Sequence, residues 1–166
     1  KLPPFSHLGN MFSPNTLEKG RGMPNAIRRA IKENTTRLLN EPNDGLAALE
    51  CWEQEIEEWC QHDNCQWTLR FAYQVIEKRG TGGGGFRKMY GDFLAESECF
   101  LPEISQWKLA ELMRDTARIW SDFAMALKQE SEQKKPNSLR LQNCIQQVIV
   151  TEKCYLEAAQ KAFSDE

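Results

Sequence analysis

The chain has 166 residues, a net charge of −3 and charged residues at 27% of its length. That length is enough to bury a core, and the composition excludes a fully disordered protein. No apolar run approaches the roughly 20 residues of a membrane-spanning helix, and a basic surplus for binding nucleic acid is missing. We expect a soluble globular domain that binds neither a membrane nor nucleic acid.

The first part of the chain has no regular pattern. It begins with Lys1 and shows no signal segment, so we expect it to be part of a longer protein. Prolines and glycines interrupt residues 1–24, and the apolar residues among them have no period. We predict an irregular arm or linker over 1–24 and a single all-helical domain over 25–166.

Apolar residues then recur with helical spacing in six segments, and no stretch alternates convincingly with period two. Turn residues, the glycine run and Pro136 separate the segments. The pattern predicts an all-α fold, a compact bundle of about six helices. The helices are expected at about 25–39, 45–61, 66–79, from Phe86 onward, 102–132 and 138–163.

Two details of these helices are also predicted. Asn25 is a residue type that caps helices, so we expect it to begin the first one. Trp67, Phe71 and Val75 widen the apolar stripe of the third helix. We therefore expect the third helix to be the most buried.

The cysteines favour a reducing, cytoplasmic location. The chain has six, which is an even number, but it is not the small secreted type that depends on disulfides. Cys60, His62 and Cys65 lie close together in the sequence, yet a structural zinc site needs four ligands. The remaining histidine, His7, is far away, so we predict no metal and no cofactor.

The sequence also lacks a catalytic constellation. A Ser or Cys nucleophile needs a nearby base, and only His7 and His62 could supply an imidazole. We therefore predict no catalytic residue in this chain. Glu152 falls inside the apolar stripe of the last helix, where a buried carboxylate needs a partner. Arg70, in the third helix, is the candidate partner of a structural ion pair.

The most distinctive feature is the glycine run between Gly80 and Gly85. It matches the letters of the dinucleotide motif G-x-G-x-x-G, but a helix precedes it where that motif needs a strand. A glycine loop leading into a helix still offers backbone N–H groups to an anion such as phosphate, carboxylate or phosphopantetheine. The alternative is a hinge or a close-packed helix junction. The predicted ligand-binding residues are Arg79, Gly80, Thr81, Gly82, Gly83, Gly84, Gly85, Arg87 and Tyr90.

The segment from Trp67 to Leu94 resembles the helical C-terminal domain of butirosin biosynthesis protein H-like proteins. The shared pattern is Gly-x-Gly-Gly, then Phe-Arg, Tyr and Phe-Leu on the next helix. The resemblance begins at about Asn25 and is loose after Cys99. It implies the C-terminal part of an acyltransferase-like protein, in which an N-terminal cysteine-hydrolase-like domain holds the nucleophile. The butirosin protein moves an acyl group from a carrier protein to an aminoglycoside amine.

Three functions follow from these observations. The leading one is an accessory domain that helps to bind the acyl donor or its acyl carrier protein, with Arg79, Arg87 and the glycine loop at the phosphopantetheine phosphate. Its partner is then the upstream domain of the same protein. The second is a non-catalytic packing or oligomerisation module, which forms a homodimer or completes the core of the full protein. The third is an independent small enzyme or metal protein, which the shortage of histidines disfavours.

Overall fold

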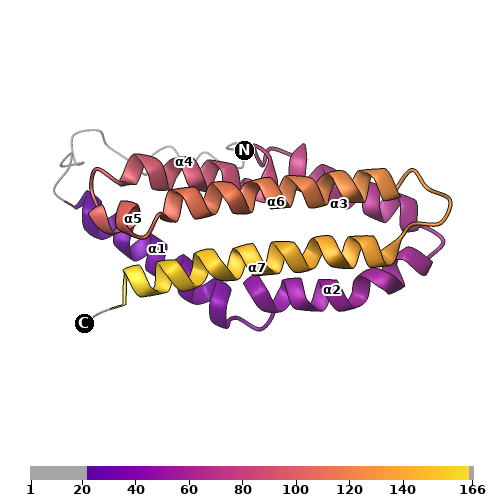
Figure 1. Cartoon of the computed structure of the whole chain (residues 1–166), viewed down its shortest axis with the longest axis horizontal. Coiled ribbons are helices and arrows are strands. Elements are labelled where there is room, and N and C mark those ends of the chain that lie inside the picture. The colour runs from indigo at the N-terminus through magenta and orange to yellow at the C-terminus, as the bar shows by residue number, and fades with distance from the viewer. Residues whose placement is uncertain (1–21, 165–166) are drawn as a thin grey trace, which may run out of the picture.

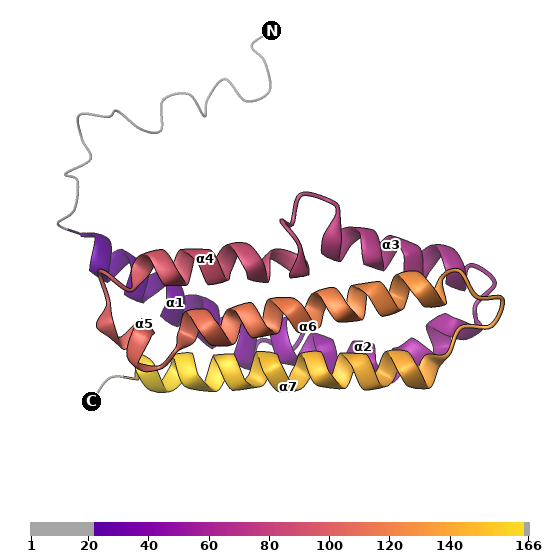
Figure 2. The same cartoon turned by 45° about the horizontal axis from the view of Figure 1, so that its top comes forward.

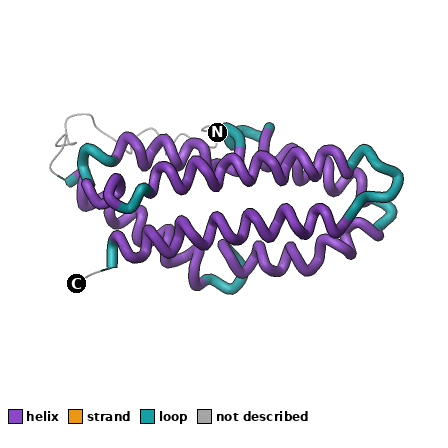
Figure 3. Tube along the Cα trace, in the orientation of Figure 1, coloured by secondary structure: helices purple, strands orange, loops and turns teal. Residues whose placement is uncertain are grey.

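The computed structural model describes residues 22–164, and every regular element within this range is helical (Figure 3). Six of the helices have at least 11 residues, whereas α5 has 5. The prediction of an all-α bundle of about six helices is confirmed. The helices are α1 (Met23–Asn40), α2 (Gly45–Gln61), α3 (Cys65–Glu77), α4 (Arg87–Ser97), α5 (Pro102–Gln106), α6 (Leu109–Glu130) and α7 (Ser138–Ala162).

The helices form four rows, and two of the rows are broken near their middle (Figures 1 and 2). α1 and α2 follow one another in what we call the first row, and α3 and α4 do so in the second row. α6 and α7, with 22 and 25 residues, run the length of the bundle without a break. The chain therefore passes along the bundle four times, and successive passes run in opposite directions.

The two continuous helices form the centre of the packing. α6 lies along α7, the second row packs on α6, and the first row packs on α7. Direct contact between the two broken rows is mainly that of α2 with α3.

The core is divided into two apolar clusters, one at each end of the bundle. One joins α2 and α3 to the adjoining halves of α6 and α7 and includes Ile56 and Leu69. The other joins α1, α4 and α5 to the remaining halves and includes Ile31 and Leu94. Full burial of one such side chain stabilises the fold by about 1.5–3 kcal/mol. The buried Glu152 lies near the middle of α7, where the two clusters meet.

The predicted helix over 102–132 is wrong in one respect, because it is two helices. α5 ends at Gln106, Lys108 adopts a left-handed conformation with φ of 52°, and α6 begins at Leu109. Ile104 and Leu109 are both fully buried although they are five residues apart. Five positions of a continuous helix turn a side chain well away from its starting face, so the break lets both residues reach the core.

The boundary between arm and helix also differs from the prediction. α1 begins at Met23, and Gly22 rather than Asn25 precedes it, so the predicted cap is wrong. Pro24 lies in the first turn, where a missing N–H costs little. The predicted arm otherwise falls on residues 1–21, which lie outside the described residues.

The third predicted helix is not the most buried one. Trp67, Phe71 and Val75 are 68%, 38% and 41% exposed, and the most extensively buried helix is α6. The reason is the arrangement of the rows, because α3 packs on α6 along one side and leaves its opposite side uncovered. The wide apolar stripe of α3 is therefore partly a surface feature.

Candidate functional site

Both rows are broken at a glycine that lies too close to backbone for any side chain. In the first row, a Cβ on Gly45 would lie 2.0 Å from the carbonyl oxygen of Leu38. In the second row, a Cβ on Gly84 would lie 2.7 Å from the carbonyl oxygen of Ala117 in α6. Both glycines have positive φ, at 54° and 56°. The two breaks are thus specified by backbone conformation and close packing.

The glycine run is built around a carboxylate that the chain itself supplies. Glu77, the last residue of α3, accepts at Oε1 from the Gly84 N–H at 2.9 Å and from the Ser121 hydroxyl at 2.6 Å. The hydroxyl of Thr81 donates to the Ile76 carbonyl at 2.6 Å and accepts from the Gly83 N–H at 3.3 Å. Two of the predicted anion-binding amides, those of residues 83 and 84, therefore already have protein partners.

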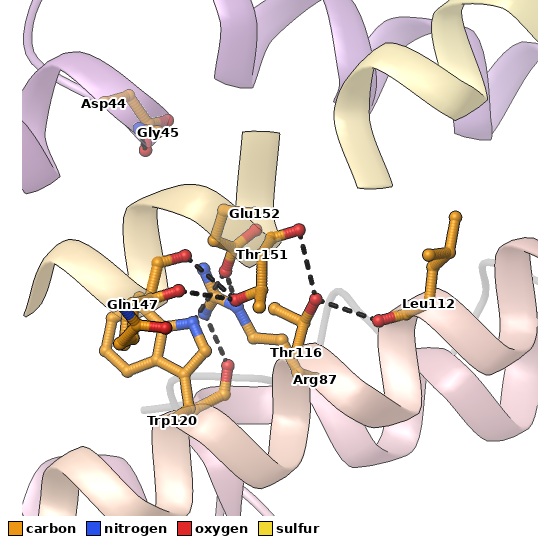
Figure 4. A network of polar contacts seen from close by, with 11 residues as sticks. Asp44, Gly45, Arg87, Leu112, Thr116, Trp120, Gln147, Thr151 and Glu152 are labelled. Carbon is orange, nitrogen blue, oxygen red and sulfur yellow. Dashed lines mark hydrogen bonds and ion pairs between the residues drawn. The ribbon is translucent and has the colours of Figure 1, made fainter. Parts of the chain in front are cut away.

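The glycine run places Arg87 near the centre of the bundle (Figure 4). Its Nε donates to Glu152 Oε1 at 2.6 Å, and its Nη1 donates to the Gly85 carbonyl at 2.7 Å. Its guanidinium carbon lies 4.6 Å from the centre of the Trp120 ring. Trp120 Nε1 donates to the same Glu152 oxygen, also at 2.6 Å. α4, α6 and α7 are joined here by a single buried carboxylate.

The prediction that Glu152 is buried is confirmed, because its side chain is 4% exposed. The predicted partner is wrong: Arg70 instead pairs with Glu132 at 3.0 Å on the surface. Arg70 is the partner that the sequence pattern indicates, because it interrupts an apolar helix. Arg87 contacts Glu152 because of the way the glycine run folds. Nothing in the local sequence indicates that these two residues form an ion pair.

The other predicted site residues lie on two sides of the glycine run. Arg79 is exposed, stacks on Phe71 at 4.5 Å and donates to the side chain of Gln74 at 3.2 Å. Tyr90 lies one turn along α4 from Arg87, and its oxygen accepts from the Tyr155 hydroxyl at 3.1 Å. Burial raises the pKa of Tyr90, and hydrogen bonds from Tyr155 and Asn34 oppose that rise.

A cavity of about 370 Å³ lies where the two breaks face each other. Most of its lining residues are polar or charged, and we call it the polar cavity. The first row contributes mainly polar side chains, the second row contributes the start of α4, and α6 and α7 supply the remaining wall. The lining residues are Asn34, Arg37, Leu38, Asp44, Gly85, Phe86, Arg87, Tyr90, Met113, Glu152 and Tyr155. Arg37 and Asp44 form an ion pair at 3.3 Å, and Figure 4 shows Asp44 and Gly45 across from Glu152.

An apolar cavity of about 440 Å³ lies next to the polar one, between α2 and α3. Its walls are mainly aromatic and aliphatic. The lining residues are Trp52, Trp59, Thr68, Phe71, Ala72, Val75, Ile76, Thr81, Gly85, Phe86, Arg87 and Trp120. The two cavities share Gly85, Phe86 and Arg87, and we call them together the groove.

Phe86 is a strained residue at the point where the cavities meet. It has a left-handed conformation with φ of 72°, although it is not a glycine, and its side chain is 57% exposed. Such a conformation is costly for a bulky residue and persists when the surroundings impose it. This conformation leaves the Phe86 residue in the lining of both cavities.

Metal ligands and cysteines are dispersed in the described residues 22–164. No group of three or more His, Cys, Asp or Glu side chains lies together within that range. His62 is on the surface 3.8 Å from Glu58, and the other histidine, His7, lies outside the described residues. All six cysteines are free thiols.

Sequence reasoning missed the part of the site that the first row and α7 contribute. No pattern in the sequence distinguishes Asn34, Arg37 and Asp44 from the other polar residues of the first helix and its turn. Tyr155 belongs to the apolar stripe of the last helix, so it has no sign of a polar role. One signal could have found them. The turn at Asp44 and the glycine run each interrupt a row midway, so antiparallel packing brings the two interruptions together.

Residues 1–159 match the family described as a domain of unknown function, DUF4872, and the chain therefore belongs to that family. No curated protein and no solved structure matches the chain. Within the described residues, none of the helices combines the length and the apolar character that crossing a bilayer requires.

Proposed function

We propose that this DUF4872 domain is an accessory binding domain that holds an acyl donor, an acyl group on a phosphopantetheine arm, for an acyltransferase of the butirosin biosynthesis protein H-like kind. Chemistry would then belong to an upstream cysteine-hydrolase-like domain, and an acyl carrier protein would be the partner that presents the arm. The free thiols agree with a cytoplasmic setting.

The observation that carries this proposal is the division of the groove into an apolar and a polar cavity. An acyl chain is apolar, and the pantetheine that follows it carries amide and hydroxyl groups. The apolar cavity, walled by Trp52, Trp59 and Phe71, suits the acyl chain, since each buried CH₂ contributes about 0.8 kcal/mol. The polar cavity, with Asn34 and Tyr90, suits the amide-bearing part.

With the ligand in this orientation, the phosphate is expected to contact Arg37 and not Arg79 or Arg87. If the acyl chain lies in the apolar cavity, the phosphate end leaves through the polar one, where Arg37 lies. Arg87 is less suited than expected because its charge is paired with a buried carboxylate, Glu152, whereas the ion pair of Arg37 with Asp44 is exposed to solvent. Arg79 stacks on Phe71, a wall of the apolar cavity, and so lies at the acyl end of the groove.

A titration of the chain with S-octanoyl phosphopantetheine, followed by tryptophan fluorescence, tests the proposal. Val75 lines the apolar cavity and is 41% exposed, so Val75→Glu should weaken binding by more than about tenfold. Val150, 61% exposed on α7, lines neither cavity, so Val150→Glu is the matched control and should bind like the unmodified chain. The absence of binding at millimolar ligand, or equal binding by Val75→Glu, would refute the proposal.

The second candidate function, a packing or oligomerisation module, is favoured by a different observation. Large apolar side chains are exposed on α3 and at the start of α4, and Trp67 and Phe71 stack on each other at 5.2 Å. Contiguous exposed apolar side chains are typical of protein contacts. Light scattering at tens of micromolar should then show a dimer that Trp67→Glu converts to a monomer.

A further inference from the structure

An exposed apolar stripe runs along α3, beside the apolar cavity. It consists of Trp67, Phe71 and Val75, which are all exposed and follow one another at intervals of four residues, and we call it the α3 stripe. Trp67 and Phe71 stack with their ring centres 5.2 Å apart, so the protein already holds these two side chains together. Residues four apart form a ridge along a helix, and such a ridge fits into the surface of a second helix.

Arg79 adds a charge to this stripe that the described residues do not neutralise. Its guanidinium carbon lies 4.5 Å from the centre of the Phe71 ring, and its Nη2 donates to Gln74 Oε1 at 3.2 Å. Within residues 22–164 every other arginine forms an ion pair with a carboxylate, whereas Arg79 forms none. A guanidinium that is held on a ring and still has unused N–H groups is suited to bind a carboxylate.

The opposite charge lies beside the start of α3. Glu55 and Glu58 of α2, together with Asp63, line a cavity of about 560 Å³ that shares Trp59 and Thr68 with the apolar cavity. Among the ion pairs of the described residues, none joins a lysine or an arginine to these three carboxylates. The surface along α3 is therefore negative at one end and positive at the other.

We propose that the α3 stripe docks an amphipathic helix of a partner protein, parallel to α3, with basic residues in its first turns and a carboxylate for Arg79 in its last turns. α3 has 13 residues and is about 20 Å long, which about four turns of a second helix cover. The dipole of a parallel helix also matches, because its positive end lies at the carboxylates and its negative end at Arg79. The inference goes beyond the proposed function, since it needs no ligand in either cavity.

Two other occupants are less compatible with this surface. An anionic membrane would approach the carboxylates beside the start of α3 as closely as it approaches Arg79, and like charges repel. A second copy of the chain that packs symmetrically about Phe71 would bring the two Arg79 guanidiniums toward each other. A helix whose opposite charges lie at opposite ends meets neither obstacle.

The probe is a synthetic peptide of about 14 residues with blocked ends, which is long enough to cover α3. Leucines with helical spacing form its apolar face, lysines occupy its first two turns, and glutamates occupy its last two. A second peptide has glutamine in place of each glutamate. The affinity of each peptide for the full chain is measured by fluorescence anisotropy. We expect micromolar binding of the glutamate peptide and about fivefold weaker binding of the glutamine peptide.

Variants of the chain connect this binding to the residues. Arg79→Gln should weaken the binding of the glutamate peptide by about fivefold and change that of the glutamine peptide by less than about twofold. Arg29→Gln, at an exposed arginine of α1, is the matched control and should bind both peptides normally. Trp67→Ala should weaken the binding of both peptides by about tenfold or more, whereas Leu139→Ala, at an exposed residue of α7, should not.

The direction of the bound helix is tested by a nitroxide label at one end of the glutamate peptide. A label at the N-terminus should broaden the amide signals near Asp63, and a label at the C-terminus should broaden those near Gly80. The reverse pattern would overturn the parallel arrangement.

Helix docking is refuted if Trp67→Ala, shown to be folded by circular dichroism, binds the glutamate peptide as tightly as Leu139→Ala. Recognition of a carboxylate is refuted if Arg79→Gln weakens the binding of both peptides equally. Absence of peptide binding refutes the inference as a whole, and light scattering and binding to phosphatidylserine vesicles then show whether a second copy or a membrane takes the stripe. The titration with S-octanoyl phosphopantetheine is a separate measurement, so either proposal can fail without the other.

Discussion

The two broken rows interrupt their helices at the same level of the bundle but are held there by different means. In the first row the break is short, and its charges, Arg37 and Asp44, are 58% and 46% exposed. In the second row the break contains the glycine run, and the charge that follows it, Arg87, meets a carboxylate that is 4% exposed. An exposed ion pair stabilises the break in the first row, and a buried ion pair stabilises the break in the second row. Substitutions at the second break should therefore lower the free energy of unfolding far more than substitutions at the first.

The largest expected effect is that of Glu152→Ala. This change leaves the Arg87 guanidinium and the Trp120 N–H without their shared acceptor. We expect the free energy of unfolding to fall by about 3–5 kcal/mol, measured by urea denaturation. Glu132→Ala, which removes the exposed partner of Arg70, is the control and should cost less than about 1 kcal/mol. Similar losses from the two variants would show that burial of the carboxylate does not set the cost of removing it.

Alanine at the two close-packed glycines tests whether the breaks share one geometric cause. Gly45→Ala and Gly84→Ala each force a Cβ to within 2.0 and 2.7 Å of a backbone oxygen, at positive φ. We expect each to lower the free energy of unfolding by about 2 kcal/mol or more. Gly80→Ala also has positive φ, but nothing lies within 4 Å of its Cβ. Thermal denaturation should place this variant closer to the unmodified chain than the other two.

Asp44 allows the cap and the charge of the first break to be separated. Its side chain accepts from the Gly45 N–H at 2.8 Å and also pairs with Arg37. Asp44→Ala should cost about 1 kcal/mol in urea denaturation, because α2 loses its cap. Asp44→Asn keeps a capping oxygen and should lower the free energy of unfolding by only a few tenths of a kcal/mol. Equal costs would show that the ion pair, rather than the cap, stabilises this break.

The smallest expected effect concerns the ion pair that joins α1 to α5. A hydrogen bond from its own backbone N–H and one from Arg28 hold the pKa of Glu103 below its usual value. A lowered carboxyl pKa stabilises the fold above the unfolded pKa, and this contribution disappears as the pH falls through the folded value. Glu103→Gln should therefore reduce the free energy of unfolding by less than about 1 kcal/mol at pH 7. The difference should vanish near pH 3, and a constant difference would exclude ionisation as its source.

Much of the fold could be predicted because the sequence carries local signals for it. The helices over 45–61 and 138–163 have clear apolar periods and Asp or Asn at their start, and the structure has them within a residue of those bounds. The break at Lys108 was missed because a lysine in a left-handed conformation has no signature in the sequence. The break is needed because Ile104 and Leu109, which would lie on different faces of one continuous helix, are both buried.

The candidate site was predicted less completely, because it is assembled from parts of the chain that are far apart. The glycine run directed attention to Arg87 and Tyr90, and an acidic residue in an apolar stripe identified Glu152 as buried. Their partners Trp120, Tyr155 and Asn34 come from α6, α7 and α1. Local patterns cannot register such contacts, since they depend on how the rows are aligned. The ion pair was therefore assigned to Arg70 rather than to Arg87.

The groove also has a consequence for how the molecule opens. Each broken row is anchored mainly to its own central helix, the first to α7 and the second to α6, and the rows give each other little direct support. Either row can then detach while the hairpin of α6 and α7 and the opposite row stay in place. Backbone amides of α1 and of α4 should therefore exchange with solvent hydrogen in separate events of different free energy. Amides in the middle of α6 and α7 should exchange last, only when the whole domain unfolds.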